Sequence, residues 1–393
     1  MLASSYPRND SDSASIFLRH LAESLKTQNL TIHVLAPADK VSGEKSENGI
    51  IVHRFRYFFA RWQKLAYGSG VLSNLKRNPL LWLQVPLFIG SMFFSLLWLL
   101  NRIRPDVIHA HWVIPQGLLA VFAKSIYKIP VVITVHGTDA FALKSKLLEW
   151  IKRITLSKCD AWTSNTHATA NSVLIYTSTP KPHIIPMGVN IQRFASGDRQ
   201  KLRAQISDSE YIILFVGRLV EKKGVTDLIT AFSLLPSAIQ QQTRLWIIGD
   251  GDQSNQLRTL SKELALGNKI TFLGMIPNYD LPDYYSAADL FVAPSIIEGQ
   301  GVVFLEAAAA KLCVVSTSVG GISEVIDDGM TGILVAPEHP GELAQSIGKI
   351  LTDQSLRQQL AEQAYRKLVD TYSWDSISKD FKQLFQELSR SIS

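Results

Sequence analysis

Cysteine is almost absent from this chain: Cys159 and Cys313 are the only two in 393 residues, and no CxxC pair occurs. This scarcity excludes a disulfide framework and a thiolate zinc site, and it fits a reducing compartment. The sequence also lacks internal repeats, low-complexity tracts and any RNA- or DNA-binding signature. The opening stretch MLASSYPRNDSDSAS has no apolar core of the kind found in secretion signals, so we expect a cytoplasmic protein.

Charged residues are few, at 19%, while 46% of the residues are hydrophobic, which is typical of a globular protein. A length of 393 residues exceeds what one ordinary core accommodates, so the prediction is two domains.

Charge is distributed unevenly along the chain. Residues 1–187 contain 21 Lys and Arg against 10 Asp and Glu, whereas the remainder contains 19 against 24. A basic first half indicates contact with a large polyanion, either nucleic acid or an anionic membrane surface. Since no nucleic-acid signature accompanies the charge, we favour the membrane.

One stretch, residues 80–101, is apolar and long enough to span a bilayer. Within and after it, Gln84, Ser91, Ser95 and Arg102 follow helical spacing and form a narrow polar stripe. A span would also separate the preceding residues from strands of the same domain. Plain burial and contact with the membrane interface remain open, and we favour the interface because of the cations nearby in sequence.

Short Val- and Ile-rich runs alternate with helical patterns, which predicts an α/β protein with two doubly wound parallel sheets. The expected strands are 31–37, 106–112, 131–137, 161–165, 183–188, 211–218, 244–251, 269–274, 289–295, 313–318 and 332–337. The join between domains is expected at 185–200, which gives domains 1–186 and 187–372. An amphipathic helix, 373–393, follows them.

The segment FVGRLVEKKG, residues 215–224, follows an expected strand and precedes an expected helix. Arg218 and Lys223 therefore lie just past the strand end, beside a helix N-terminus, where they can clamp a diphosphate. A solvated loop with ordinary surface cations is the alternative.

The segment SIIEGQGVVFLEAAAA, residues 295–310, places Glu298 in a glycine-broken turn and Glu306 in a helical run. A helix that starts near Val302 lets Glu298 reach over its N-terminus while Glu306 points inward. The backbone N–H groups of residues 299–302 then face a ligand anion, and the glycines allow close approach. Sugar recognition, metal binding and acid/base cleavage remain possible for such a carboxylate pair.

Together these motifs resemble the retaining glycosyltransferase family 4, on the two-domain GT-B fold. The Glu-x7-Glu signature and VGRLVEKKG are joined by HGTD, IIGDG, FLGMI and VGGISEVIDDGMTGILV, in the expected order and over nearly the whole chain. The resemblance implies two Rossmann-like domains facing across a cleft, with the C-terminal helix crossing back to the first domain. The first domain would bind the acceptor, and the second the donor.

The resemblance also implies roles for individual residues. Arg218 and Lys223 would bind the donor diphosphate, Glu306 the ribose and Glu298 the sugar, while His136 would approach the transferred sugar and backbone near Met275 would read the base. The implied catalytic residues are His136, Arg218, Lys223 and Glu298. The implied donor contacts also include Gly217, Gly249, Met275, Gly299, Gly301, Val302 and Glu306, and the acceptor contacts are Ser13, His111 and Asp139.

The co-substrate implied is a nucleotide-diphosphate sugar, most commonly a UDP-sugar in this family, with no metal required. Asp250 and Asp252 resemble a metal motif of another fold but lie in a turn, and His109 with His111 is a weak zinc signal. The charge asymmetry and residues 80–101 favour a lipid-linked or glycan acceptor at the cytoplasmic membrane face, in polysaccharide or glycolipid biosynthesis. No nucleic acid partner is expected.

The chain departs from the family at its start. Family members normally open with a β-strand before the first loop, so either the reading frame begins further upstream or the first sheet lacks a central strand. Two rival hypotheses are a non-catalytic module of the same fold and a hydrolase or phosphorylase that uses Glu298 and Glu306.

Overall fold

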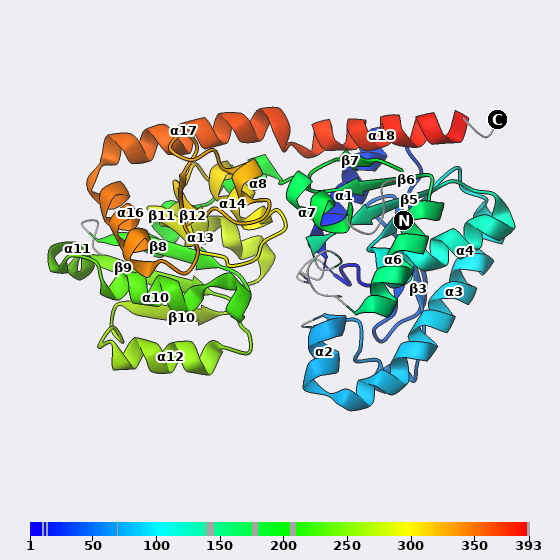
Figure 1. Ribbon diagram of the computed structural model, residues 1–393, viewed down its shortest axis with the longest axis horizontal. Helices are drawn as coiled ribbons and strands as arrows, with labels where there is room; N and C mark the ends of the chain where they lie inside the picture. Colours follow the sequence, from blue (N-terminus) through cyan, green and yellow to red (C-terminus); the bar gives the residue numbers. More distant parts are fainter. Residues whose placement is uncertain are drawn as a thin grey trace. The chain divides into compact units, whose positions relative to one another are not determined.

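The computed structural model describes residues 1–9, 12, 15–68, 70–137, 139, 145–174, 180–204 and 210–390. The chain forms two compact units (Figure 1): unit 1 comprises Met1–Pro186 and Trp374–Ser393, and unit 2 comprises Met187–Ser373. Each unit is an α/β structure with its own hydrophobic core.

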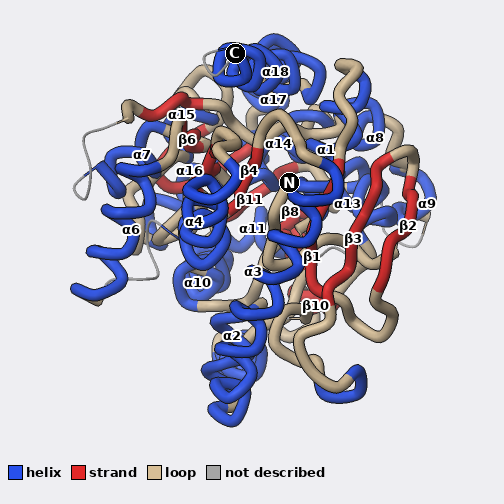
Figure 2. Tube along the Cα trace, turned by 90° about the vertical axis from the view of Figure 1, so that its right-hand side faces the viewer, coloured by secondary structure: helices blue, strands red, loops and turns tan. Residues whose placement is uncertain are grey.

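The strands of unit 1 are β1 (His33–Pro37), β2 (Gly43–Glu47), β3 (Ile50–Phe55), β4 (Ile108–His111), β5 (Val131–Val135), β6 (Ala161–Ser164) and β7 (Pro182–Ile184). They form one sheet in the order β1-β3-β2 and a parallel sheet in the order β4-β5-β6-β7. Figure 2 shows β1, β3 and β2 side by side. Leu2 links the two sheets, because it forms parallel bridges with Leu35 of β1 and with Ala110 of β4.

The helices of unit 1 are α1 (Ile16–Thr27), α2 (Val71–Arg77), α3 (Gln84–Ile103), α4 (Leu118–Tyr127), α6 (Lys146–Lys158), α7 (His167–Leu174) and α18 (Trp374–Arg390), with short helical turns η1 (Ala60–Trp62), η2 (Pro79–Leu83) and η3 (Val113–Gly117). The chain returns to unit 1 through α18, which packs on α1 as expected. Its Ile377 and Phe381 are buried in a core shared with α1 and β1.

The polar stripe predicted on residues 80–101 lies partly against the rest of unit 1. Gln84 is buried and donates to the carbonyl of Trp62 at 2.8 Å, and the Ser91 hydroxyl donates to the carbonyl of Arg56 at 2.5 Å. Two of the stripe's members thus face the protein, because their hydrogen bonds join α3 to the preceding loop.

The sheet of unit 2 has six parallel strands in the order β10-β9-β8-β11-β12-β13. These are β8 (Tyr211–Val216), β9 (Thr243–Ile248), β10 (Ile270–Gly274), β11 (Leu290–Ala293), β12 (Val314–Thr317) and β13 (Ile333–Val335). The helices are α8 (Ile191–Ala195), α9 (Arg199–Arg203), α10 (Val225–Ser233), α11 (Ser237–Gln241), α12 (Ser254–Glu263), α13 (Leu281–Ala287), α14 (Val302–Ala309), α15 (Ile322–Val325), α16 (Pro340–Thr352) and α17 (Gln354–Thr371), with the turns η4 (Glu221–Lys223) and η5 (Asn278–Asp280).

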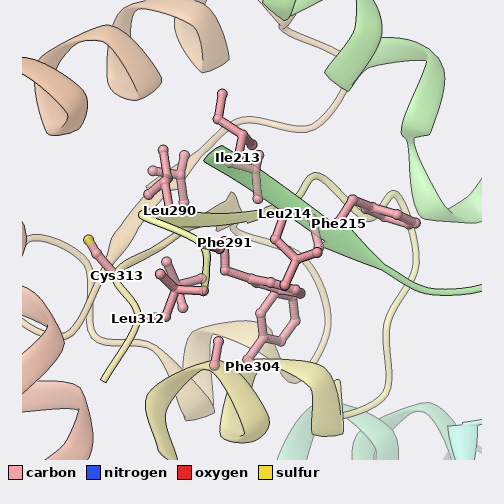
Figure 3. Close-up of a cluster of buried hydrophobic side chains, with 14 of the residues drawn as sticks. Ile213, Leu214, Phe215, Leu290, Phe291, Phe304, Leu312 and Cys313 are labelled. Atoms are coloured by element: carbon pink, nitrogen blue, oxygen red, sulfur yellow. The ribbon is translucent and has the colours of Figure 1, made fainter. Parts of the chain in front are cut away.

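The core of unit 2 fixes the position of α14. Ile213, Leu214, Leu290 and Phe291 on the central strands β8 and β11 are fully buried, as strands covered on both faces require. Figure 3 shows Phe304 of α14 packed toward Phe291, and their rings meet edge to face at 5.9 Å. This contact holds the first turn of α14 beside the carboxyl end of β11.

Candidate active site

The loop after β8 carries the predicted diphosphate-binding cations. The Gly217 N–H donates to the carbonyl of Ile248 at 3.0 Å, and Arg218, which follows it, is exposed. Lys223 ends η4, and Gly224 then adopts a left-handed φ of 63° before α10 begins. A Cβ at Gly224 would lie 1.9 Å from the carbonyl oxygen of Pro294, so only glycine fits where the two loops meet.

Lys223 and Glu298 form an ion pair within unit 2, and both side chains are largely shielded from solvent. The backbone brings them together: the N–H groups of Ile296 and Ile297 both donate to the carbonyl of Lys222, at 2.8 and 3.2 Å. The structure therefore joins the two motifs on which the prediction of a donor site rests.

Glycines shape the turn that holds Glu298. A Cβ at Gly320, whose φ is 53°, would lie 2.0 Å from the Glu298 carbonyl oxygen. The Gly299 N–H donates to the Glu298 carboxylate at 3.1 Å, and Gly301 at φ 76° precedes α14. As predicted, the helix begins at Val302, so this backbone turns sharply at the helix N-terminus.

Gly217 and Gly249 lie in direct contact at the ends of neighbouring strands. Gly249 has a φ of 134°, and a Cβ there would lie 1.8 Å from the carbonyl oxygen of Gly217. Glycine at 249 thus allows the loops after β8 and β9 to approach each other closely.

Glu306 lies in the second turn of α14, where it is buried. The Tyr285 hydroxyl donates to one of its carboxylate oxygens at 2.8 Å. Burial raises the pKa of Glu306 to about 7, and this hydrogen bond and the nearby Arg193 oppose the rise. A carboxylate with one oxygen so anchored keeps its other oxygen for a ligand hydroxyl.

Met275 follows β10 and is exposed, so its backbone lies at the carboxyl edge of the sheet. Arg193 of α8 donates to the carbonyl of Asn278, which lies a few residues further on. The predicted base-reading segment is thereby tied to α8.

The unit 1 residues predicted for the site lie at the ends of β4 and β5. His111 Nδ1 lies 3.3 Å from His136 Nε2, and both rings are buried. Burial lowers the pKa of His136 to about 3 and that of His111 well below its ordinary value, so both imidazoles are neutral near pH 7. A neutral His136 can exchange hydrogen bonds with a sugar hydroxyl but carries no positive charge.

Asp139 is buried and accepts hydrogen bonds from the N–H groups of Val113 and His136, at 3.1 and 3.2 Å. Burial raises its pKa to about 7. Its carboxylate holds together the loops after β4 and β5, so Asp139 can position His136. Ser13 lies outside the described residues.

Arg218, Lys223, Glu298 and the glycines of both motifs thus share one edge of the unit 2 sheet, while His111, His136 and Asp139 share the corresponding edge in unit 1. Among the described residues, no group of three or more His, Cys, Asp or Glu could hold a metal ion.

Three residues near the site escaped the sequence analysis. Burial lowers the pKa of Lys222, and the positive charges of the nearby Arg218 and Lys223 lower it further. Tyr285 and Arg193 flank Glu306 from α13 and α8. Lys222 could have been found from its place in the EKKG run, whereas nothing in the local sequence links Arg193 or Tyr285 to residue 306.

Comparisons with known proteins identify the family of this chain. The family model described as "Glycosyl transferases group 1" matches residues 198–367, and "Glycosyltransferase Family 4" matches residues 14–193. An uncharacterised glycosyltransferase of Methanocaldococcus jannaschii is 27% identical over 98% of this chain and 97% of its own length.

Two solved structures share the fold over almost the full length. Sucrose-phosphate synthase from Thermosynechococcus elongatus superposes with a TM-score of 0.81 at 21% identity, covering 99% of this chain and 98% of its own. HepE of Anabaena, in complex with UDP and glucose, superposes with a TM-score of 0.78 at 20% identity, covering 98% of each chain. The expected GT-B fold is confirmed, and the chain is a glycosyltransferase of the group 1 and family 4 class.

Proposed function

We propose that the protein is a retaining glycosyltransferase that moves a sugar from a nucleotide-diphosphate donor to a hydroxyl group of a lipid-linked or glycan acceptor. The nucleotide that we propose first is UDP. One observation carries the donor assignment: the ion pair between Lys223 and Glu298 joins the loop that carries Arg218 to the turn before α14. The UDP complex of the Anabaena neighbour supports the choice of uridine.

In this proposal Arg218 and Lys223 bind the diphosphate, Glu306 the ribose and Glu298 the sugar. As the bond from the anomeric carbon to the phosphate oxygen breaks, negative charge grows on the diphosphate and positive charge on the sugar ring. Arg218, Lys223 and the backbone N–H groups around 299–302 stabilise the leaving group without a metal. The acceptor oxygen attacks the face that the phosphate leaves, and a phosphate oxygen takes its proton.

Lys223 has two alternative partners in this scheme. Without ligand it pairs with Glu298. A bound diphosphate carries more negative charge than one carboxylate, so Lys223 is expected to turn to the phosphate and leave Glu298 to accept sugar hydroxyls. His136 in its neutral form is the proposed hydrogen-bonding partner of the transferred sugar.

The proposed setting is polysaccharide or glycolipid assembly at the cytoplasmic membrane face. Residues 48–105 contain eight Lys and Arg and no Asp or Glu. This excess of positive charge supports an acceptor held near an anionic lipid surface.

The first test is thermal unfolding of the purified protein with UDP, GDP and ADP and their sugars, alongside Arg218→Ala and Glu306→Ala. A ligand at about 100 times its dissociation constant adds about 2.7 kcal/mol of stability, enough to raise the midpoint by a few degrees. We expect a shift with uridine nucleotides that both variants lose. A folded protein with no shift for any nucleotide would sink the proposal.

The second test is transfer itself. Radiolabelled sugar from the nucleotide that binds is followed into a lipid extract of membranes, and NMR of the product reports its anomeric configuration. Retention is expected. Release of free sugar in samples that contain no nucleotide would favour the hydrolase instead. Binding of the nucleotide sugar without transfer to any extract would favour the non-catalytic module.

A further inference from the structure

The outward face of α3 is strongly apolar. Leu83 at its N-cap, Leu87, Phe94 and Trp98 are spaced by four, seven and four residues, so they share one face of the helix. Their exposed fractions are 75%, 49%, 70% and 58%. A helix on the surface of a water-soluble unit normally presents polar residues on this face.

Both the inward and the outward face of α3 are apolar. Gln84 and Ser91, which could have faced water, instead donate to carbonyls of the protein. The apolar residues take the outside, so the arrangement favours a medium less polar than water.

The apolar surface continues beyond α3. Leu80 and Trp82 of η2 are exposed, and so are Phe59 and Trp62 at η1. The rings of Phe59 and Trp62 meet edge to face at 5.9 Å. Tryptophan combines an apolar body with one N–H donor, which suits the boundary between lipid tails and headgroups.

Cations border this surface, and acidic residues do not occur in its sequence. From Asn48 to Pro105 the chain has no Asp or Glu. The exposed basic residues of this segment are Arg56, Arg61, Lys64, Lys76, Arg77, Arg102 and Arg104. Such a combination complements anionic headgroups above an apolar layer.

The other face of α3 belongs to the core of unit 1. Phe88, Met92, Leu96 and Leu100 are buried along its length, and the helix packs on α4 and β1. A membrane-spanning position would remove all these side chains from that core. The helix must therefore meet a membrane lengthwise.

We propose that α3, with η1 and η2, docks unit 1 on an anionic lipid bilayer and lies in the plane of its interface. Leu83, Leu87, Phe94 and Trp98 enter the boundary between headgroups and tails, while the basic border residues contact lipid phosphates. This inference deepens the proposed function, on which it rests for its biological purpose, by naming the surface that brings the enzyme to its acceptor.

The test is cosedimentation of the full chain with phosphatidylcholine vesicles, with or without about one-third phosphatidylglycerol. The apolar variant is Leu83→Ser/Phe94→Ser/Trp98→Ser. Its matched control, Leu234→Ser/Met330→Ser/Val369→Ser, removes exposed apolar residues of unit 2. We expect wild type and control to bind anionic vesicles, and the apolar variant to bind at least about tenfold more weakly.

A second pair of variants tests the charges. Arg61→Gln/Lys64→Gln/Lys76→Gln/Arg77→Gln should lose the preference for phosphatidylglycerol, as should wild type in about 0.5 M salt. Lys262→Gln/Lys349→Gln/Arg366→Gln/Lys379→Gln removes the same charge from exposed positions elsewhere and should retain it.

Three results would overturn the inference. The wild-type protein could stay in the supernatant with both lipids, or the apolar variant could bind vesicles as strongly as wild type does. The wild-type protein could also form a dimer that does not bind vesicles and that becomes monomeric in the apolar variant. UDP-induced thermal stabilisation is read in every sample. If the protein binds vesicles but UDP does not raise its unfolding temperature, the donor assignment fails and the docking surface stands. If UDP raises the unfolding temperature but the protein does not bind vesicles, the docking surface fails and the donor assignment stands.

Discussion

At the residue scale, Glu306 shows how a fold can tune a carboxylate. The side chain is buried, which raises its pKa, and the Tyr285 hydroxyl and Arg193 hold that rise to a pKa of about 7. In an unfolded chain a glutamate has a pKa of about 4.3. The folded protein therefore binds a proton more tightly at this position than the unfolded chain does.

This difference predicts a pH-dependent stability. Between about pH 5 and pH 7 the folded state retains most of the Glu306 proton that the unfolded state has released, so the free energy of unfolding should fall as the pH rises through this range and level off above it. The contribution is of the order of 2–3 kcal/mol. Urea unfolding should show that Glu306→Gln lacks this part of the decline and is more stable than wild type at pH 8. Parallel pH profiles for the two proteins would contradict the prediction.

Removal of the Tyr285 hydroxyl should move the titration of Glu306 upward, because the hydrogen bond favours the ionised form. If ionised Glu306 binds ribose, Tyr285→Phe should bind UDP more weakly at pH 7 and recover part of its affinity at higher pH. Calorimetric titration across this range is the measurement. A uniform loss of affinity at all pH values would indicate a packing role for Tyr285 instead.

Gly249 is required by geometry. Alanine there would place its Cβ against the Gly217 carbonyl in a backbone conformation that L residues rarely adopt, so Gly249→Ala should cost about 3 kcal/mol or more. Gly267→Ala is the control, since a Cβ at that position meets nothing within 4 Å. Denaturant unfolding of the two variants should differ by at least that amount.

At the element scale, the ion pair joins the loop before α10 to the loop before α14. Because Glu298 occupies Lys223 in the absence of ligand, Glu298→Gln should bind free UDP as tightly as wild type or more tightly. The same variant should lose transfer activity by about 100-fold or more, since its contact with the sugar is weakened. Weaker UDP binding in this variant would place Glu298 in diphosphate recognition instead.

The strands of the two parallel sheets could be predicted from the sequence, whereas the β2–β3 hairpin could not. Each expected strand overlaps an observed one, because parallel strands covered on both faces are continuous apolar runs. The hairpin of β2 and β3 was missed, although Asn48-Gly49 between them is a strong turn signal, because the polar run of β2 is exposed and carries no apolar alternation.

Only those features of the site that depend on neighbouring residues in the sequence could be predicted. The start of α14 at Val302 follows from the glycines before it. The hydrogen bond from Tyr285 to Glu306 and the nearby charge of Arg193 depend on how α8, α13 and α14 pack, and spacing along one chain does not encode such packing. The polar stripe on α3 shows the same thing: periodicity identifies a face, and only the neighbouring elements decide which way that face points.

At the scale of the whole molecule, the two halves differ in surface chemistry as well as in charge. The apolar and basic surface of η1, η2 and α3 belongs to unit 1, whereas the cations of the proposed donor site belong to unit 2. Substitutions at one should therefore leave the other intact, because each surface belongs to a unit with its own hydrophobic core. This separation makes the vesicle and nucleotide measurements independent readouts.

The buried side chain of Gln300 has a consequence for how unit 2 can be isolated. Its amide accepts from the N–H of Met187 and donates to the carbonyl of the same residue, each at 2.8 Å. A fragment cut at residue 198, where the family match begins, would leave both groups of this amide buried and unpaired, at about 1–3 kcal/mol each. A fragment of residues 187–373 should accordingly express as a cooperatively unfolding protein, and one of 198–373 should melt well below it in a calorimeter.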